Sequence, residues 1–294
     1  VKLSKPKKSS SWLMSGLNLQ NALGNISLPG SGNNFLKKKV GKNKFSFSKS
    51  MSSPLVFKNN IILSDSTGTI YRINQKGKPI WKKNIYVKQY KKIYKNLNLT
   101  IYNNNIYVAD NIGFIYAISF ENGTIVWIKN HGIPLKSNIK ILQNKLFVIN
   151  QDSRLICLDI DKGDSIWDLR TISSFIKSQS VMGLAISNNN SVLMLNSSGD
   201  LKKINADDGT VEWSLNLTMS SLSDTADLFS SSDVVIHDDE LIVSTSSSTF
   251  SFNVSNGYLN WENDIGSKNK PIVDGKNIFL VTNNGYFINL ERNS

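Results

Sequence analysis

The stretch Gly113-Phe-Ile-Tyr-Ala-Ile-Ser-Phe-Glu-Asn-Gly-Thr-Ile-Val-Trp127 decides the fold, because its frame recurs along the chain. It predicts a strand over Phe114 to Ser119, a tight turn at Asn122-Gly123, and a second strand that ends on an indole. The frame returns at residues 153–167, 199–213 and 247–261 and, one residue shorter, at 68–81. Five of the six tryptophans are therefore markers of a repeat.

A glycine stands four residues before the tryptophan in every repeat, and glycine readily adopts the positive φ that a tight turn requires. The indole beyond it is expected to dock on the neighbouring repeat as a large apolar anchor. We therefore predict a structural role for two sets of residues, namely Gly77, Gly123, Gly163, Gly209 and Gly257, and Trp81, Trp127, Trp167, Trp213 and Trp261.

The repeat tryptophans are spaced 40 to 48 residues apart. Each repeat opens with a polar hairpin turn, as in Ile101-Tyr-Asn-Asn-Asn-Ile106, and continues through three further strands. The second strands are expected over residues 106–109, 146–149, 192–195, 241–244 and 278–282. Four antiparallel strands in this period are typical of a propeller blade. We predict an all-β fold, a β-propeller of four-stranded antiparallel blades with about six blades visible.

The sixth repeat stops early, since Gly285 would place its tryptophan near position 299 and the sequence ends at Ser294. Its third strand is predicted and its fourth is not. The segment Phe35-Leu-Lys-Lys-Lys-Val-Gly41 resembles the residues around each repeat tryptophan, such as Trp81-Lys-Lys-Asn-Ile85, with Phe35 in the indole's place, so we predict a lone outer strand there. Either this strand closes a six-bladed ring or the sequence is part of a longer propeller, and we expect the second.

Residues 1–34 are rich in Ser, Asn, Gly and Lys and lack periodicity. We predict a basic, extended or loosely docked arm over 1–34, anchored by Trp12 and Asn21–Leu28, and a single propeller domain over 35–294. The net charge is +12, and residues 1–100 carry 20 Lys or Arg with Asp65 as the one acid. Because no aromatic residues interleave with the lysines, we predict a solvated basic arm and no nucleic-acid partner, with an anionic lipid or a nucleic acid as the alternative.

Signals for catalysis or metal binding are missing from the sequence. His131 and His237 lie in loops of different repeats and belong to no metal-ligand spacing. Cys157 alternates with Leu155 on a predicted strand and is expected in the core. We predict a protein that is not an enzyme and has no catalytic residue, bound metal or cofactor.

The frame Ala117-Ile-Ser-Phe-Glu-Asn-Gly-Thr-Ile-Val-Trp127 and its copy from Cys157 to Trp167 resemble the repeat of quinoprotein-like (PQQ-like) β-propellers. Within that superfamily, residues 12–294 resemble the BamB-like outer-membrane assembly factors. The resemblance implies an eight-bladed ring and a periplasmic lipoprotein, held at the outer membrane by a lipid anchor that this sequence does not contain. It also implies a scaffold, monomeric within a hetero-complex, that binds the POTRA domains of a BamA-type protein and unfolded β-barrel clients.

Two loops carry the partner contact in that family. A Leu-x-Leu-Arg stretch falls on Ser174-Phe-Ile176-Lys177, where residues match only in kind and Lys cannot reproduce a bidentate Arg contact. A Leu-Ser-Asp-x-Asp stretch falls on Leu222-Ser-Asp-Thr-Ala-Asp227, with one extra residue. The resemblance thus implies partner-binding roles for Ile176, Lys177, Leu222, Ser223, Asp224 and Asp227.

Two other functions share this architecture. The PQQ-dependent dehydrogenases of the superfamily need a calcium site, and some members hold the quinone under a vicinal disulfide, which a single cysteine excludes. No repeat departs from the pattern to offer a calcium cluster. An extracytoplasmic sensor or polymer-binding propeller would share every structural feature of the sequence.

Overall fold

The computed structural model describes residues 1–28, 36–41, 52–171, 181–218 and 229–292. These residues form six antiparallel sheets, each built from strands that are consecutive in the chain. Five sheets have four strands and the last has three. We call the sheets blades 1 to 6 in chain order. Within the described residues, no helix is long and apolar enough to span a membrane.

Blades 1 to 3 are built from the strands between residues 55 and 169. Blade 1 contains β1 (Leu55–Phe57), β2 (Asn60–Ser64), β3 (Thr69–Asn74) and β4 (Pro79–Asn84), and a short 3-10 helix, η1 (Lys88–Tyr90), comes after it. Blade 2 contains β5 (Leu97–Tyr102), β6 (Asn105–Asp110), β7 (Phe114–Ser119) and β8 (Ile125–Asn130). Blade 3 contains β9 (Lys140–Leu142), β10 (Lys145–Ile149), β11 (Leu155–Asp159) and β12 (Ser165–Leu169).

Blades 4 to 6 are built in the same order. Blade 4 contains β13 (Gly183–Ile186), β14 (Ser191–Leu195), β15 (Asp200–Asn205) and β16 (Val211–Asn216). Blade 5 contains β17 (Val235–His237), β18 (Glu240–Ser244), β19 (Thr249–Asn253) and β20 (Leu259–Asn263). Blade 6 contains β21 (Ile272–Asp274), β22 (Asn277–Val281) and β23 (Phe287–Glu291).

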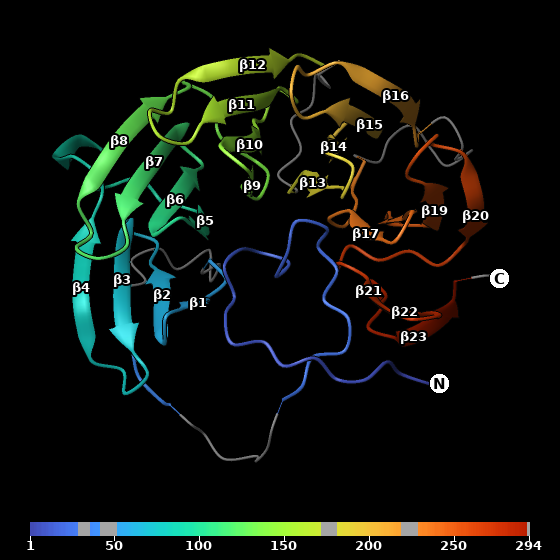
Figure 1. Ribbon diagram of the computed structural model, residues 1–294, viewed down its shortest axis with the longest axis horizontal. Coiled ribbons are helices and arrows are strands. Elements are labelled where there is room, and N and C mark those ends of the chain that lie inside the picture. The colour runs from blue at the N-terminus through green and yellow to red at the C-terminus, as the bar shows by residue number, and fades with distance from the viewer. Residues whose placement is uncertain (29–35, 42–51, 172–180, 219–228, 293–294) are drawn as a thin grey trace.

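The blades stand around a common centre, with the first strand of each nearest the middle and the fourth at the circumference (Figure 1). The ring is open between blade 6 and blade 1, at the lower side of the view (Figure 1). The predicted all-β propeller of four-stranded blades is therefore confirmed, and β7 has the bounds predicted from the repeat frame.

Turn residues with positive φ and a recurring β-bulge determine where the strands turn and bend. The hairpin between the first two strands turns on residues with positive φ, such as Asn59 (59°), Asn104 (62°) and Asp238 (56°), which Asn and Asp tolerate better than most side chains. The pairing of the third strand with the fourth contains a β-bulge at a recurring position of the repeat, for example between Ala117 and Ile118. The bulge increases the local twist and bends the outer strand.

The core is divided into interblade layers. Each of five hydrophobic clusters combines buried residues of two neighbouring blades, as where Ile106 of β6 packs with Ile62 of β2. Burial of such side chains stabilises by about 2 kcal/mol each. The ring is therefore held by contacts between consecutive blades.

The N-terminal residues cross the middle of the ring (Figure 1). Main-chain oxygens of the arm accept hydrogen bonds from the inner strands of four blades, as when Ile101 N donates to Leu13 O at 2.7 Å and Ile236 N donates to Gln20 O at 2.9 Å. Ser4 bonds to Asp274 of blade 6. Of the two predicted alternatives, an extended or a loosely docked arm, the second is wrong, because main-chain oxygens of the arm accept hydrogen bonds from amides of the inner strands.

Residues 36–41 do not form the predicted lone outer strand in the described structure. They pack instead on the turn of blade 1, where Leu36 Cδ1 lies 3.0 Å from the position that a Cβ would take on Gly77. In blades 2 to 5 an indole occupies this place. The predicted stand-in, Phe35, lies outside the described residues, and Leu36 makes the contact.

Candidate protein-binding interface

Blades 1 to 4 each dock on the next blade through one indole and one glycine. Trp81, Trp127, Trp167 and Trp213 lie against Gly123, Gly163, Gly209 and Gly257 of the next blade, where an added Cβ would come within 2.8 to 2.9 Å of ring carbons. Their Nε1 atoms donate to the main-chain oxygens of Phe120, Ile160, Ala206 and Val254, at 2.8 to 3.3 Å. A large aromatic ring and a hydrogen bond thus fix the angle between neighbouring blades.

The last indole departs from this pattern. Trp261 Nε1 is buried, and within the described part of the chain it has no hydrogen-bond partner. Arg292 stands at the repeat position of Phe120, so its main-chain oxygen is the expected acceptor for this indole. The amide of Arg292 donates to Lys276 O, just as the amide of Phe120 donates to Asn104 O. Blade 6 therefore completes the backbone part of the docking site without satisfying the indole.

The β12–β13 and β16–β17 connections both lie at the same end of blade 4. In a sheet of four consecutive antiparallel strands, the chain leaves the fourth strand at the end that carries the turn between the second and third strands. Here that turn is residues 196–199 of blade 4. Asn196 Nδ2 donates to Thr171 Oγ1 at 3.0 Å, and Gly199 O accepts from Leu217 N at 2.9 Å. One turn thus contacts the stems of both the β12–β13 and the β16–β17 connections.

The stems are firmly held. Thr171 Oγ1 also donates to Ser153 O in blade 3, at 2.7 Å. On the other side, Thr218 Cγ2 lies 2.7 Å from the position that a Cβ would take on Gly199, which has a φ of 78°. Only glycine fits there without displacing the stem. The two connections therefore start from fixed points beside the 196–199 turn of blade 4.

All six residues predicted to bind a partner belong to these two connections. Ile176 and Lys177 lie in the β12–β13 connection, and Leu222, Ser223, Asp224 and Asp227 lie in the β16–β17 connection. They fall outside the described residues. The described structure brings the stems of their two segments to one turn.

An ion pair lies beside the first stem. Arg154 Nε donates to Asp168 Oδ1 at 2.7 Å, and a second bond joins the same two side chains. This contact lowers the pKa of Asp168 and raises the pKa of Arg154. A bidentate guanidinium–carboxylate pair fixes the orientation of both side chains, so it adds rigidity where β11 begins and β12 ends.

The centre of the ring is filled by the arm and a buried lysine. Lys140, on β9, is fully buried, and its Nζ donates to Asn18 O at 2.8 Å and to Asn21 Oδ1 at 2.6 Å. Asn21 Nδ2 in turn donates to Leu184 O at 3.0 Å and to Val234 O at 2.8 Å. Burial lowers the pKa of Lys140 to about 7. One polar network therefore joins the arm to blades 3, 4 and 5.

The two histidines and the cysteine lie in different parts of the fold, since His131 follows β8, Cys157 lies on β11 and His237 lies on β17. Burial lowers the pKa of His131 and of His237 and raises the pKa of the Cys157 thiol to about 12, which keeps that thiol protonated. Cys157 lies in the core between blades 3 and 4, as predicted. Among the described residues, no group of three or more His, Cys, Asp or Glu could hold a metal ion.

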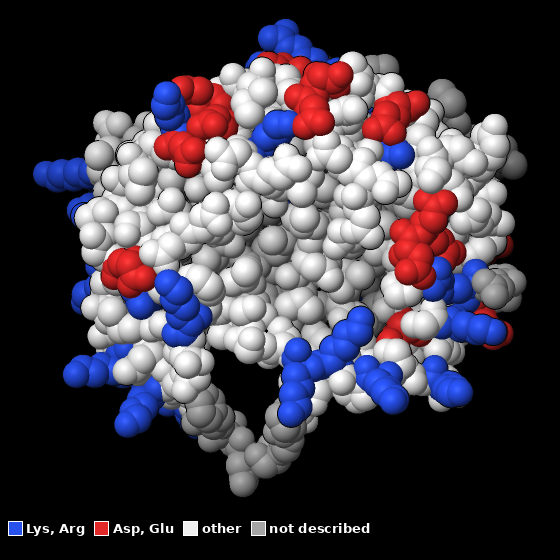
Figure 2. Space-filling model, viewed as in Figure 1, with Lys and Arg blue, Asp and Glu red and all other residues white. Residues whose placement is uncertain are grey.

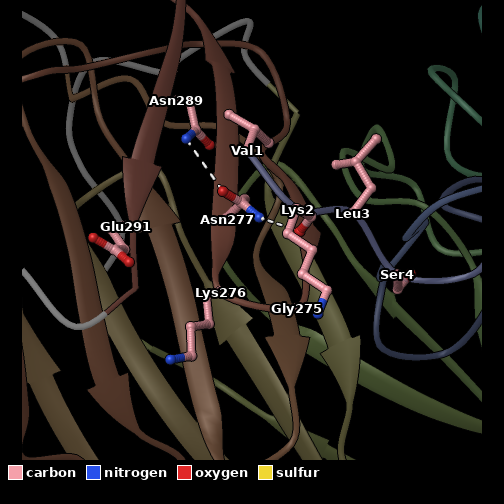
Figure 3. Close-up of a pocket in the computed structure, with 9 residues that line it drawn as sticks. All are labelled: Val1, Lys2, Leu3, Ser4, Gly275, Lys276, Asn277, Asn289 and Glu291. Carbon is pink, nitrogen blue, oxygen red and sulfur yellow. Dashed lines mark hydrogen bonds between the residues drawn. The ribbon is translucent and has the colours of Figure 1, made fainter.

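A hollow of about 680 Å³ lies where the arm rests on blade 6 (Figure 3). Asn277 Nδ2 donates to Lys2 O at 3.0 Å, and Asn289 Nδ2 donates to Asn277 Oδ1 at 3.2 Å. Lys276 and Glu291 are the other charged residues of its lining, which contains no His or Cys. The hollow lies between the arm and blade 6, and its lining contains no nucleophile paired with a general base.

Sequence reasoning missed Lys140, and it placed Asn21 in the anchoring run Asn21–Leu28 without identifying its partners. Lys140 stands between Ile139 and Ile141 in a strand that is otherwise apolar, and a lone lysine at an inward position is a signal of a buried polar contact. Asn21 carries no such signal, because its partners Leu184 and Val234 are 163 and 213 residues away.

Comparison with known proteins gives one family match. Residues 66–294 match the family model PQQ_2, described as outer membrane protein assembly factor BamB. No curated protein matches the chain in sequence with significance. The matched region contains all six blades except the first two strands of blade 1.

Solved structures share the fold. BamB from Moraxella catarrhalis superposes with a TM-score of 0.70 at 14% identity, covering 82% of this chain and 72% of that one. Quinohemoprotein alcohol dehydrogenases from Pseudomonas putida HK5 (ADHIIG; TM-score 0.66, 13% identity) and Comamonas testosteroni (0.68, 12%) cover 87% and 88% of this chain. The aligned parts are 48% and 49% of those enzymes. At these identities the likeness shows the fold alone.

Proposed function

We propose that this chain, which belongs to the family of the outer membrane protein assembly factor BamB, is a non-enzymatic protein-binding scaffold of the periplasm. Its partner would be a BamA-type protein of the outer membrane, contacted through POTRA domains, and its role would be to help the assembly of β-barrel clients. The protein would act as one subunit of a hetero-complex at that membrane.

One observation carries the proposal. The turn at residues 196–199 holds the stems of the two connections in which the family's partner contacts fall. Two variable segments that start from fixed points beside the same blade can present a single combined surface to a partner. A rigid ring that displays connecting segments in this way is a common arrangement for binding sites.

The residues do not fit the calcium and quinone of the dehydrogenases that share the fold. Among the described residues no cluster of carboxylates or other ligands could hold a metal ion, and the single cysteine cannot form a disulfide. The arm also fills the centre of the ring, where Asn21 is fully buried. A cofactor on the ring axis would have to displace the arm and leave Lys140 without its acceptors.

The scaffold role is tested by affinity capture of the full chain on immobilised POTRA domains of the cognate BamA-type protein. We expect binding by the unmodified protein and a loss of at least roughly tenfold for the charge-reversal variant Lys177→Glu/Asp224→Lys/Asp227→Lys, because interface charge pairs become like-charge contacts. Absence of binding by the unmodified protein would overturn the proposal.

A matched control carries the same charge changes on blades 3 and 5. Lys162→Glu/Glu262→Lys/Asp264→Lys alters three exposed residues outside both connections, namely Lys162 in the β11–β12 turn, Glu262 on β20 and Asp264 directly after β20. It should bind as the unmodified protein does. The enzyme alternative has its own readout, dye-linked oxidation of alcohols or sugars after titration with PQQ and calcium, which we expect to be absent.

A further inference from the structure

We propose that the rim of blade 1, and above all the 87–93 loop after β4, is a docking surface for an anionic lipid bilayer. The loop has the sequence Val87-Lys-Gln-Tyr-Lys-Lys-Ile93. The inference goes beyond the scaffold role and rests on blade 1 alone, so it stands or falls independently of POTRA binding.

The positive charge of the N-terminal third is concentrated on this blade and is not neutralised. Eleven exposed lysines lie between positions 37 and 92 in the described structure, and of these only Lys58 pairs with an acid, Glu121. The one acid in residues 1–100, Asp65, is buried and accepts bonds from Thr67 N and Tyr71 Oη. The lysines therefore repel one another and favour an anionic partner.

Comparison with the next blade shows what is missing. In blade 2, Lys129 stands two residues after its tryptophan and forms an ion pair of 2.7 Å with Asp164, the residue after a turn glycine. In blade 1 the lysine at the same position is Lys83, and the residue after the facing glycine is Thr124. The turn residue that faces the lysine is therefore a carboxylate for Lys129 and an uncharged threonine for Lys83.

Positive and negative side chains also occupy different parts of the surface. Lys and Arg gather along the lower margin of the face in Figure 2, over blade 1 and the arm, whereas Asp and Glu lie mainly along the upper and right margins. Lys82 and Lys91 also line a hollow of about 380 Å³, together with Thr67, Thr69, Tyr71, Asn84 and Asp65. The Asp65 carboxylate accepts hydrogen bonds from Thr67 N and Tyr71 Oη, so among the described residues the two lysines are the free charges of this lining. Two cations beside hydroxyl and amide groups suit a phosphate-bearing headgroup.

The 87–93 loop adds apolar groups to this charge. Val87 is 62% exposed and Ile93 is 44% exposed, next to Lys88, Lys91 and Lys92. Aliphatic side chains interspersed with lysines are typical of segments that lie in the headgroup region of a membrane. A nucleic-acid surface would instead need exposed aromatic rings, and the two large exposed side chains of this loop are aliphatic.

The loop is held in this exposed conformation from beneath. Lys95 is buried, stands 4.8 Å from the centre of the Tyr86 ring, and donates to Ile93 O at 2.6 Å and to Tyr90 O. Tyr90 packs edge-on against Phe114 at 5.3 Å. The loop therefore turns Tyr90 inward and leaves Val87 and Ile93 outside, so exposure of these two side chains is a fixed feature of the fold.

The experiment is flotation of the full chain with vesicles. At about 50 mM NaCl we expect binding to phosphatidylcholine vesicles that contain roughly a third phosphatidylglycerol, none to pure phosphatidylcholine, and release at about 500 mM NaCl. Lys88→Glu/Lys91→Glu/Lys92→Glu should lower the partition coefficient roughly 100-fold or more, from about fivefold per lysine removed. Val87→Ser/Ile93→Ser should lower it about fivefold or more through lost apolar burial.

The matched control, Lys162→Glu/Lys268→Glu/Lys276→Glu, changes the net charge equally through exposed lysines of other blades. It should stay within about twofold of the unmodified protein, since headgroup attraction falls off within about a Debye length. Equal losses in both triple variants would overturn the proposal, as would equal binding to both kinds of vesicle. Binding of a labelled oligonucleotide with no binding to anionic vesicles would overturn it in favour of a polynucleotide.

Discussion

At the scale of single residues, the contact between an indole and a glycine sets the geometry of the ring. Gly163 has a φ of 71°, and an added Cβ would lie 2.8 Å from Trp127 Cε3 and 3.0 Å from Lys129 Cγ. The glycine therefore meets two requirements together, a left-handed backbone and room for the ring.

These requirements can be separated by experiment. Gly163→Ala should lower the free energy of unfolding by about 2 to 5 kcal/mol, because backbone strain and overpacking add. Gly132→Ala is the matched control, since Gly132 has a φ of 70° with no atom within 4 Å of an added Cβ. It should cost only about 1 to 2 kcal/mol. Equal costs in urea unfolding would show that the indole contact contributes nothing.

The indole nitrogen gives a second comparison. Trp127 Nε1 donates to Ile160 O at 2.8 Å, whereas the buried Trp261 Nε1 has no partner among the described residues. Trp127→Phe should cost about 1 to 3 kcal/mol beyond the loss of ring size, because it leaves a buried carbonyl without its donor. Trp261→Phe removes an unpaired donor and should cost less. Calorimetric unfolding of both variants checks the order, and a costlier Trp261→Phe would contradict it.

At the scale of elements, the strand β9 carries the buried Lys140 that holds the arm. Burial lowers the pKa of Lys140 to about 7, with Asp233 acting to raise it and Lys270 to lower it. In the unfolded chain a lysine has its ordinary pKa of about 10.4. Between about pH 7 and pH 10 the unfolded state therefore binds more protons than the folded state, and stability should rise with pH across this window.

The measurement is urea unfolding at several pH values from about 7 to 9. Below about pH 7 this lysine is protonated in both states and contributes no slope, and within the window its contribution approaches about 1.4 kcal/mol per pH unit. Tyr71, whose pKa is raised to about 12, adds an opposite slope only above about pH 10. Lys140→Met should flatten the curve relative to the unmodified protein, and parallel curves would refute the assignment.

Strands and arm differ in how far the sequence predicts them. The bounds of β7 can be derived from the residues between Gly113 and Gly123, because alternation and turn chemistry act within a few positions. The path of the arm depends on Asn21 meeting Leu184 and Val234, and no local pattern encodes such distant contacts. The partner-binding loops are predicted from a family resemblance, and their six residues stay a prediction.

At the scale of the whole molecule, the arm links blades that are not all neighbours. Among the described residues each hydrophobic cluster joins two neighbouring blades, and the ring is open between blades 6 and 1 (Figure 1). The arm accepts hydrogen bonds from the amides of Val56, Ile101, Ile186 and Ile236, in blades 1, 2, 4 and 5. A single segment thus couples the inner strands across the ring.

This coupling predicts a joint response to one substitution. Asn21 has a φ of 60°, which glycine accepts, so Asn21→Gly removes the side chain without straining the backbone. Loss of the bonds to Leu184 O, Val234 O and Lys140 Nζ should lower stability by about 2 to 4 kcal/mol. The arm should then leave the centre more often.

Amide hydrogen exchange measures that opening. The four amides that donate to the arm, those of Val56, Ile101, Ile186 and Ile236, should lose protection together in Asn21→Gly, because their acceptors belong to one segment. The amide of Ser119, which donates to Thr124 O in the outer turn of blade 2, serves as the control and should keep its protection. If only Ile186 and Ile236, the two nearest the substituted residue in the network, exchanged faster, the arm would be a set of independent contacts. Simultaneous loss in all four blades would instead identify the arm as the element that holds the open ring together.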